Sequence, residues 1–335
     1  MPIPNPNYNP PFNVTRSSHV ILNVSDLAAS KEHYVDMLGL VLTEQTSDAL
    51  YLRGLDEHSH HSVVLRKSDS DTAGTVERIG LRVFSDDDLD QAYAYFQEQG
   101  VSCRFVDAPF QGKTLHYEDA VGMPVELCAT MDRAPFMHDK FHLYRGGHPK
   151  GLDHFQVATH DVQSATDFYM AIGFRMSEYT DSDDSSALWG TWLQRKGNPQ
   201  DIVFTNGQGP SLHHFAMQVQ DVSSLIHACD IVGSLGREGC IDRGPARHGI
   251  SNALFVYFRD PDGHRMEFYD AHYTMIDIDH EPIRWPVSNT KRSNLWGMPA
   301  SRRWYYEVSE FHGVPTQPPL LRAEPMTLER FLDTQ

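Results

Sequence analysis

One pattern occurs twice in the chain, and this repeat restricts the possible folds more than any other feature. The stretch HVILNVSDLAASKEHYVDMLGL at residues 19–40 matches HFQVATHDVQSATDFYMAIGF at residues 154–174. Each copy opens on His, has Asp seven and Tyr fifteen residues later, and closes with Gly before an apolar residue: His19, Asp26 and Tyr34, then His154, Asp161 and Tyr169. Such internal similarity reveals the unit from which a fold is built.

Each copy predicts a strand followed by a helix. The alternating apolar residues of HVILNV and HFQVAT are typical of strands, the Asp of a helix N-cap and the Gly of a helix end. A third copy begins at His214 with Asp221 seven residues later, and a weaker fourth begins at Arg78. The module ends match too, because HYEDAVGMPVELC and YFRDPDGHRMEFY place Glu126 over Glu267.

The repeats predict an α+β fold of four βαβββ modules, arranged in two tandem domains with mixed sheets. We expect an N-terminal arm (1–16), a two-module structural domain (17–147), a two-module catalytic metal-binding domain (148–280) and a C-terminal extension (281–335). The extension, with its stretch RRWYYEVSEFHGV, is a candidate cover for a pocket, and surface packing is its plainer interpretation.

Composition excludes several classes of protein. A formal net charge of -17 with scattered basic residues disfavours nucleic-acid binding, which needs clustered Lys and Arg. No apolar run has membrane-spanning length, and the start MPIPNPNYNPPFN lacks a signal-peptide core. The four cysteines show no CxxC spacing, which fits a reducing compartment. We therefore expect a soluble cytoplasmic protein without nucleic-acid or membrane partners.

Two adjacent histidines in LHHFAMQVQD (212–221) raise the question of which one does chemistry. His214 occupies the same place in its module as His19 and His154, whereas His213 has no counterpart. Successive side chains of a strand point to opposite faces. We therefore expect His154 and His214 to face each other across a shared cavity, and His213 to point away into packing or solvent.

A hairpin supplies a third candidate ligand. In LFVYFRDPDGHRMEFYD, the Asp-Pro-Asp-Gly turn fits a three-residue loop with Gly263 in the left-handed conformation. This loop length places Tyr257 opposite Glu267, a carboxylate among apolar residues where an unpaired charge is costly to bury. Two His and one carboxylate are the facial triad of non-haem Fe(II) enzymes. We predict a metal site of His154, His214 and Glu267, although each histidine alone would more often be structural.

The first half serves as an internal control. It has His19 and Glu126 in the corresponding places, but Arg78 stands where the second histidine would be. A cation replaces a ligand there, so we predict that this vestigial site is structural and holds no metal.

The motifs LDHFQVA, GPSLHHFAMQV and RGPARHGISNALFVYFRDPDGHRMEFYD resemble the type I extradiol catechol dioxygenases of the vicinal oxygen chelate superfamily. The resemblance runs from about residue 16 to about residue 305. It implies a glyoxalase-like fold, Fe(II) or Mn(II) held by His154, His214 and Glu267, and a homotetramer. It also implies that an aromatic diol and O2 react to give a ring-opened semialdehyde.

The same resemblance implies roles for residues around the metal. His248 and Tyr257 would hydrogen-bond the bound substrate and oxygen, Arg243 would hold a substrate carboxylate, and Trp192 would line the pocket. For Tyr257 the hairpin register is independent support. Without the resemblance, Arg243 would be a surface charge near a loop and Trp192 a core aromatic residue.

Three positions depart from the family pattern. Gln200 stands where the family usually has a proton-carrying histidine, and an amide does not exchange protons near neutral pH. Gln156 replaces a usual Asn. Ser293, next to the substrate-binding candidate Arg292, replaces an Arg of the carboxylate clamp in homoprotocatechuate-cleaving members. We therefore expect a differently substituted catechol, a trihydroxybenzene or a hydroquinone-like ring.

Two other functions stay open at this point. One is a non-oxidative member of the same superfamily, an isomerase or lyase that uses Zn, Ni or Mn, although such sites often have a further ligand and Arg78 offers none. The other is a protein that binds a small aromatic compound without chemistry, which Gln200 favours.

Overall fold

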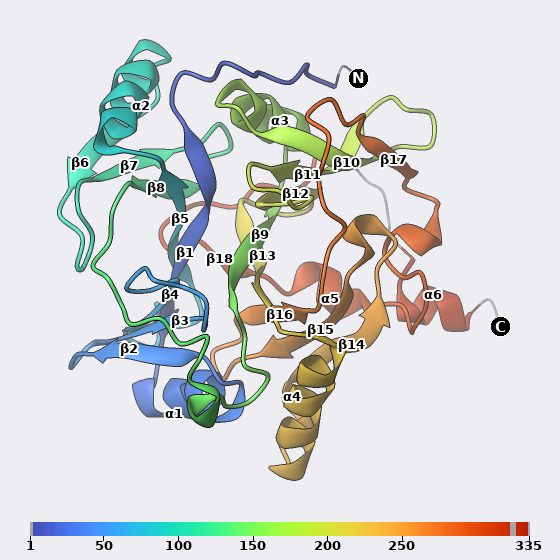
Figure 1. The fold of residues 1–335 in the computed structure, drawn as a ribbon. Helices are drawn as coiled ribbons and strands as arrows, with labels where there is room; N and C mark the ends of the chain where they lie inside the picture. The colour runs from blue at the N-terminus through green and yellow to red at the C-terminus, as the bar shows by residue number, and fades with distance from the viewer. Residues whose placement is uncertain (1–2, 322–325, 334–335) are drawn as a thin grey trace.

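Two mixed β-sheets form the framework of the protein (Figure 1). The computed structural model describes residues 3–321 and 326–333, so residues 1–2 of the predicted arm and 322–325 and 334–335 of the predicted extension lie outside the described residues. Within those ranges the first sheet has the strand order β2-β3-β4-β1-β5-β8-β7-β6. The second has the order β14-β15-β16-β13-β9-β12-β11-β10-β17, and β18 pairs with β13.

Each sheet is built from two modules, and the second sheet also contains β17 and β18 of the C-terminal extension. The strands of the first sheet are β1 (Val14–Val24), β2 (Val41–Gln45), β3 (Ala49–Arg53), β4 (Val63–Lys67), β5 (Val76–Val83), β6 (Cys103–Val106), β7 (Thr114–Glu118) and β8 (Pro124–Cys128). Those of the second are β9 (Gly151–Thr159), β10 (Arg175–Asp181), β11 (Leu188–Gln194), β12 (Ile202–Asn206), β13 (Ser211–Gln218), β14 (Ile241–Arg247), β15 (Leu254–Arg259), β16 (Arg265–Tyr269), β17 (Ile283–Pro286) and β18 (Ser309–Glu310).

A helix follows the first strand of every module. These helices are α1 (Leu27–Lys31, continued by a π-helical turn, Glu32–Met37), α2 (Asp86–Glu98), α3 (Val162–Ala171) and α4 (Val222–Ser234), and the extension adds α5 (Arg302–Tyr306) and α6 (Leu328–Leu332). Short 3-10 turns occupy Phe141–Leu143, Glu238–Cys240, Ile250–Asn252 and Thr290–Arg292. The predicted α+β fold of four βαβββ modules in two tandem domains is confirmed.

The predicted aspartate N-caps are also confirmed. The carboxylate oxygen Oδ1 accepts a hydrogen bond from a backbone N–H of the first helical turn in three modules, at 2.7 Å for Asp26, 3.0 Å for Asp161 and 2.8 Å for Asp221. One boundary differs: β1 begins at Val14, inside the predicted arm, because Val14 pairs with Val83 of β5 and is completely buried.

The two repeat tyrosines connect the halves of the molecule. The hydroxyl of Tyr34 donates to Oδ2 of Asp260 at 3.0 Å, and that of Tyr169 donates to Oδ2 of Asp119 at 3.2 Å. Asp119 and Asp260 occupy the same place in the matching module ends of the two halves. Each of these tyrosines lies in the first module of its own half and contacts the second module of the other half. One apolar core includes residues of both sheets.

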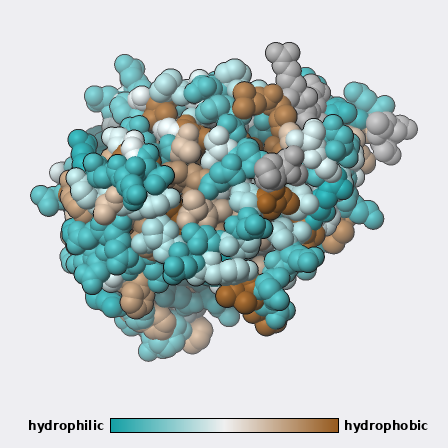
Figure 2. Space-filling model, turned by 90° about the horizontal axis from the view of Figure 1, so that it is seen from above, coloured by the Kyte–Doolittle hydropathy of each residue, from teal (hydrophilic) through white to brown (hydrophobic). Residues whose placement is uncertain are grey.

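The face shown in Figure 2 is largely hydrophilic, with scattered apolar side chains. Among the described residues, no helix has the length and apolar character needed to cross a membrane.

Candidate metal centre

Three neighbouring strands bring His154, His214 and Glu267 together. β9, β13 and β16 are adjacent in the second sheet, and Ala216 of β13 pairs with both His154 and Glu267. Nε2 of His154 and Nε2 of His214 each lie 3.2 Å from Oε2 of Glu267. The three side chains are only 2%, 2% and 3% exposed. The structure thus places two imidazoles and one carboxylate around a single buried point.

The ionisation of Glu267 and the neutrality of His214 suit a divalent cation, while Asp153 and Glu267 outweigh burial and raise the pKa of His154. Burial raises the pKa of Glu267, but His154 and His214 outweigh burial and hold this pKa well below its usual range. Burial lowers the pKa of His214 to about 4. An ionised carboxylate beside a neutral imidazole is the state in which both bind a metal. The donor set therefore fits the predicted cation.

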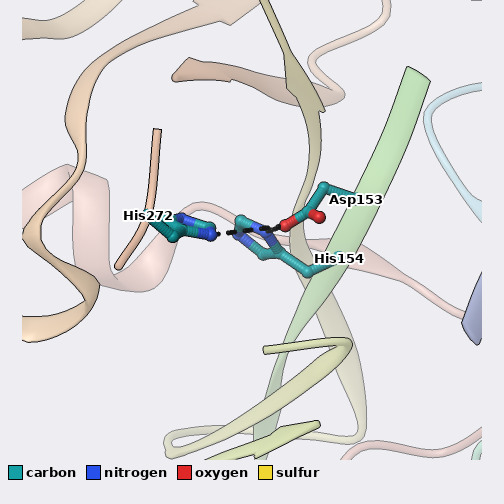
Figure 3. Close-up of side chains that lie close together, drawn as sticks. All are labelled: Asp153, His154 and His272. Carbon is teal, nitrogen blue, oxygen red and sulfur yellow. Dashed lines mark hydrogen bonds and ion pairs between the residues drawn. The ribbon is translucent and has the colours of Figure 1, made fainter. Parts of the chain in front are cut away.

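The second ring nitrogen of each histidine is held by a protein group. Nδ1 of His154 lies 2.8 Å from Oδ2 of Asp153, and His272 lies beside the same ring (Figure 3). Nδ1 of His214 lies 2.8 Å from Nδ1 of His213. Such contacts fix the tautomer and orientation of a metal-binding histidine and leave Nε2 free for the metal.

His213 does not point to the opposite face, as regular strand alternation predicted. The pairing of β13 with β9 shifts between Leu212 and His214, so His213 is the extra residue of a β-bulge. The bulge brings its ring beside His214, and its Nε2 lies 3.0 Å from the carbonyl oxygen of Trp304. His213 thus supports His214 and stays outside the three converging donors.

A cavity opens over these donors, and every residue predicted for the second-half site lines it: His154, His214, Glu267, His248, Tyr257, Gln200, Trp192, Arg243, Arg292, Gln156 and Ser293. Six lining residues carried no prediction: Trp189, Thr205, Ile250, Ser251, Trp304 and Tyr305. Trp304 and Tyr305 come from RRWYYEVSEFHGV, the aromatic stretch that marked the extension as a candidate cover.

Comparison with protein families agrees with this site. The model of the glyoxalase/bleomycin resistance protein/dioxygenase superfamily matches residues 16–127 and 151–268, which is more than half of the 335 residues. The chain belongs to this superfamily. All three candidate ligands of the second half lie within the matched ranges.

Within the superfamily, the chain is similar to extradiol ring-cleaving dioxygenases. Homoprotocatechuate 2,3-dioxygenase from Brevibacterium fuscum, in a complex with 3,4-dihydroxyphenylacetate, is 34% identical with a TM-score of 0.87, covering 94% of this chain and 99% of that chain. The manganese-dependent 2,3-dihydroxybiphenyl 1,2-dioxygenase of Geobacillus genomosp. 3 is 27% identical over 84% of this chain and 93% of its own. Metapyrocatechase of Geobacillus stearothermophilus is 25% identical over 84% and 88%. The resemblance to the extradiol branch of the superfamily is confirmed.

Tyr257 and His248 form a hydrogen-bonded pair in this dioxygenase cavity. Tyr257 pairs with Glu267 across the β15–β16 hairpin, as its turn predicted. Nδ1 of His248 donates to the carbonyl oxygen of Ser293 at 2.5 Å, and its Nε2 lies 3.2 Å from the hydroxyl of Tyr257. Burial and nearby Arg243 lower the pKa of His248 to about 3. The ring is neutral, and its Nε2 lone pair accepts the tyrosine proton.

Two guanidinium groups lie on the wall despite the serine at position 293. Nη2 of Arg243 donates to Oγ of Ser293 at 3.0 Å, while its Nε and Nη1 are buried and have no hydrogen-bond partner among the described residues. The group stacks on Trp304, with Cζ 4.4 Å from the ring centre. Arg292 lies over Trp189 at 4.7 Å. Arg243 and Arg292 are therefore the two guanidinium groups among the described residues that line this cavity.

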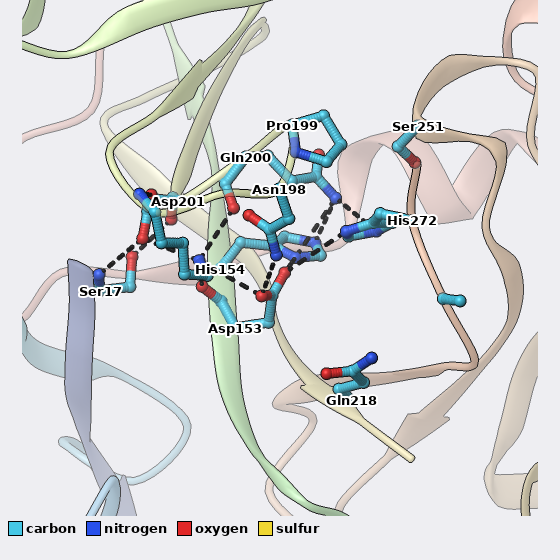
Figure 4. Close-up of polar contacts among 12 residues, drawn as sticks. Ser17, Asp153, His154, Asn198, Pro199, Gln200, Asp201, Gln218, Ser251 and His272 are labelled. Atoms are coloured by element: carbon cyan, nitrogen blue, oxygen red, sulfur yellow. Dashed lines mark hydrogen bonds and ion pairs between the residues drawn. The ribbon is translucent and has the colours of Figure 1, made fainter. Parts of the chain in front are cut away.

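A network of hydrogen bonds and ion pairs holds the carboxylate of Asp153, which contacts His154 (Figure 4). Nδ2 of Asn198 donates to Oδ1 of Asp153 at 2.5 Å, and Nζ of Lys196 lies 3.2 Å from the same oxygen. Lys196 also contacts Oδ1 of Asp201 at 2.7 Å. That oxygen accepts the backbone N–H of Ser17, in β1, at 2.9 Å. The network links the candidate ligand His154 to the first sheet.

In the first half, His19 and Glu126 meet as His154 and Glu267 do in the second, but an arginine stands in the place of the second histidine. Nε2 of His19 lies 2.5 Å from Oε1 of Glu126, and Nε2 of His116 lies 3.1 Å from Oε2. Nε of Arg78, at the place of His214, lies 3.8 Å from Oε2 of Glu126. Burial lowers the pKa of His19, but Glu126 outweighs burial and raises it to about 9. The structure brings the three predicted residues together, and the absence of a metal there stays a prediction.

Asp153 and His272 are the neighbours of His154 that the sequence did not indicate. Regular strand alternation would place Asp153 on the face opposite to His154, but the pairing of β9 with β13 shifts at this residue. His272 follows the last strand of the module in a segment without periodicity. The sequence held one signal for each residue: an Asp lies directly before the candidate ligand His154, and a further His lies five residues after Glu267.

Proposed function

We propose that the protein opens the ring of a catechol-type substrate with O2, at a single non-haem metal ion held by His154, His214 and Glu267. The buried cluster of these three donors carries the proposal, because it lies in a member of the extradiol branch. Two imidazoles and one carboxylate leave three coordination positions for the two hydroxyls of a diol and for O2.

Fe(II) is the metal that we propose, with Mn(II) as the alternative. Both suit this ligand set, and one relative carries manganese in its name. When bound, the metal brings the diol and O2 together and stabilises the charge that develops during the reaction.

The residues of the chain prepare the substrate. Because Nε2 of His248 accepts the proton of the Tyr257 hydroxyl, the oxygen of Tyr257 is free to accept a hydrogen bond from a substrate hydroxyl. The two unpartnered donors of Arg243 suit an oxygen-bearing substituent on the ring. Trp192 and Trp304 form apolar parts of the wall and exclude water.

The substituent on the ring follows from the same residues. Arg243 and Arg292 suit an oxygen-bearing group, Ser293 stands in place of an Arg that clamps a carboxylate, and Gln200 offers an amide where an imidazole would carry protons. We propose an electron-rich ring, with a third hydroxyl group or another oxygen substituent, in place of homoprotocatechuate itself.

Oxygen consumption by the reconstituted protein tests the function. The protein would be loaded anaerobically with Fe(II) or Mn(II) and mixed in air with catechol, 3,4-dihydroxyphenylacetate, pyrogallol or hydroxyquinol. We expect oxygen uptake and a yellow ring-opened product with at least one of these compounds, and none without metal. Tight binding of a ring by the metal-loaded protein without oxygen uptake would contradict the proposal.

We also propose a cytoplasmic homotetramer. The family resemblance supports the tetramer, and four free cysteines support a reducing compartment. Light scattering of the purified protein tests the tetramer, and a mass near that of one chain would contradict it.

A further inference from the structure

Gln200 has a buried partner that belongs to no established part of the site. His272 follows β16 by three residues, and its side chain is 2% exposed. Its ring stacks on Tyr269, with centroids 4.0 Å apart and an interplanar angle of 9°. Nε2 of Gln200 lies 3.2 Å from Nε2 of this ring, as Figure 4 shows. A fixed imidazole thus meets the end of the Gln200 amide.

The same amide nitrogen also lies near His154. Nε2 of Gln200 is 3.2 Å from Nε2 and 3.3 Å from Nδ1 of His154. The lone pairs of these two ring nitrogens diverge, and the amide nitrogen is almost equally distant from both nitrogens. It does not lie along either nitrogen lone pair. His272 is therefore the hydrogen-bond partner of the amide.

The surroundings of His272 decide which end of the amide it meets. Its Nδ1 lies 3.7 Å from Oδ2 of Asp153 and makes no hydrogen bond among the described residues. A neutral imidazole has one N–H and one lone pair, and a lone pair on Nδ1 would be repelled by this carboxylate. The N–H is therefore on Nδ1, and Nε2 is the acceptor. The NH2 group of Gln200 must donate to it, which leaves the carbonyl oxygen Oε1 for the cavity that Gln200 lines.

We propose that His272 is a positioning residue that turns Oε1 of Gln200 into the cavity, where this oxygen accepts a hydrogen bond from a third hydroxyl group of an aromatic diol. The inference rests on the proposed dioxygenase function, because it assigns the substrate class of the same pocket. An imidazole at position 200 could donate or accept, whereas an amide held by His272 presents only an acceptor. A ring without the third hydroxyl leaves this buried acceptor unpaired and binds more weakly.

Anaerobic calorimetry on the Mn(II)-loaded protein tests the inference without turnover. The measured quantity is the ratio of the Kd of catechol to the Kd of pyrogallol or hydroxyquinol. We expect the natural protein to bind one of the trihydroxybenzenes about tenfold more tightly than catechol. His272→Phe keeps the stacking on Tyr269 but accepts no hydrogen bond, so the amide is free to turn and the preference falls about tenfold.

A rescue and a matched control separate positioning from loss of structure. Gln200→Glu in the His272→Phe background restores the preference, because a carboxylate has an oxygen at either end. His280→Phe, in the same segment but outside the cavity lining, leaves the ratio unchanged.

An unchanged ratio in His272→Phe, or an equal loss of affinity for catechol and both trihydroxybenzenes, overturns the role of His272. The expected ratios without oxygen uptake by the Fe(II)-loaded or Mn(II)-loaded protein support that role and overturn the dioxygenase function. The two failures are therefore distinguishable.

Discussion

At the scale of single residues, one inserted position decides what His213 does. The bulge in β13 places its ring against Nδ1 of His214, and its Nε2 faces the carbonyl oxygen of Trp304. Burial and nearby Arg265 hold the pKa of His213 well below its usual range, so its ring is neutral. Nη1 of Arg265 lies 2.9 Å from the same Nε2, and Nδ1 of His213 lies 2.8 Å from Nδ1 of His214, so the held ring of His213 orients that of His214.

Metal affinity should respond unequally to the two histidines. His214→Ala removes a donor atom, so we expect the protein to lose its metal on dialysis. His213→Ala removes only the partner that orients His214, and we expect metal affinity to fall about 10- to 100-fold. Calorimetric titration with Mn(II) measures both effects, with far-ultraviolet circular dichroism as the check on folding. Equal losses in the two variants, or full affinity in His213→Ala, would contradict the assignment.

At the scale of elements, the sequence predicted whatever depends on period and register. The seven-residue spacing from His to Asp identified the first strands and the helix caps, and the length of the hairpin loop placed Tyr257 opposite Glu267. The bulge at His213 could not be predicted in this way, because it interrupts the period of the strand, and the Trp304 carbonyl that His213 contacts is distant in sequence. The extension contributes cavity-lining residues such as Trp304 and Tyr305. Regular alternation of apolar and polar residues does not indicate which of its side chains face the cavity.

The buried pair of His19 and Glu126 in the first half should make a pH-dependent contribution to the free energy of unfolding. The folded pKa of His19 is about 9 and its unfolded pKa is 6.5, so its bond to Glu126 contributes fully below pH 6.5 and is lost as the pH rises through 9. The pKa of Glu126 is lowered, so its contribution is present above 4.5 and is lost as the pH falls through the folded pKa. The pair is therefore strongest between pH 4.5 and 6.5.

Urea unfolding of the natural protein and of His19→Gln tests this pair. We expect a difference in free energy of unfolding that is about 3 kcal/mol larger at pH 6 than above pH 9. Subtracting the variant removes the titration of the other groups. His58→Gln, at a histidine stacked on Phe136 away from the cluster, is the matched control. A difference that stays constant over this range would show that the pair is not ionic.

At the scale of the whole molecule, the first half contacts the residues that surround the candidate metal site of the second half. Asp201 accepts the backbone N–H of Ser17 and contacts Lys196, and Lys196 contacts Asp153 behind the candidate ligand His154. The crossed contacts of the repeat tyrosines add a second connection, since each joins a helix of one half to a hairpin of the other. These contacts join the two halves, and through them the first half supports the position of the candidate ligand His154.

The crossed tyrosines predict matched losses of stability. Tyr34→Phe and Tyr169→Phe each remove a hydroxyl that donates to a buried carboxylate, Asp260 or Asp119, so each should lower the free energy of unfolding by about 1.5 to 3 kcal/mol. Because the two pairs share no partner, the double variant should show the sum to within about 0.5 kcal/mol. Urea unfolding at pH 8 measures these values, and Tyr306→Phe at an exposed position is the control. A loss in only one variant, or two separate unfolding transitions, would show that the halves are not joined symmetrically.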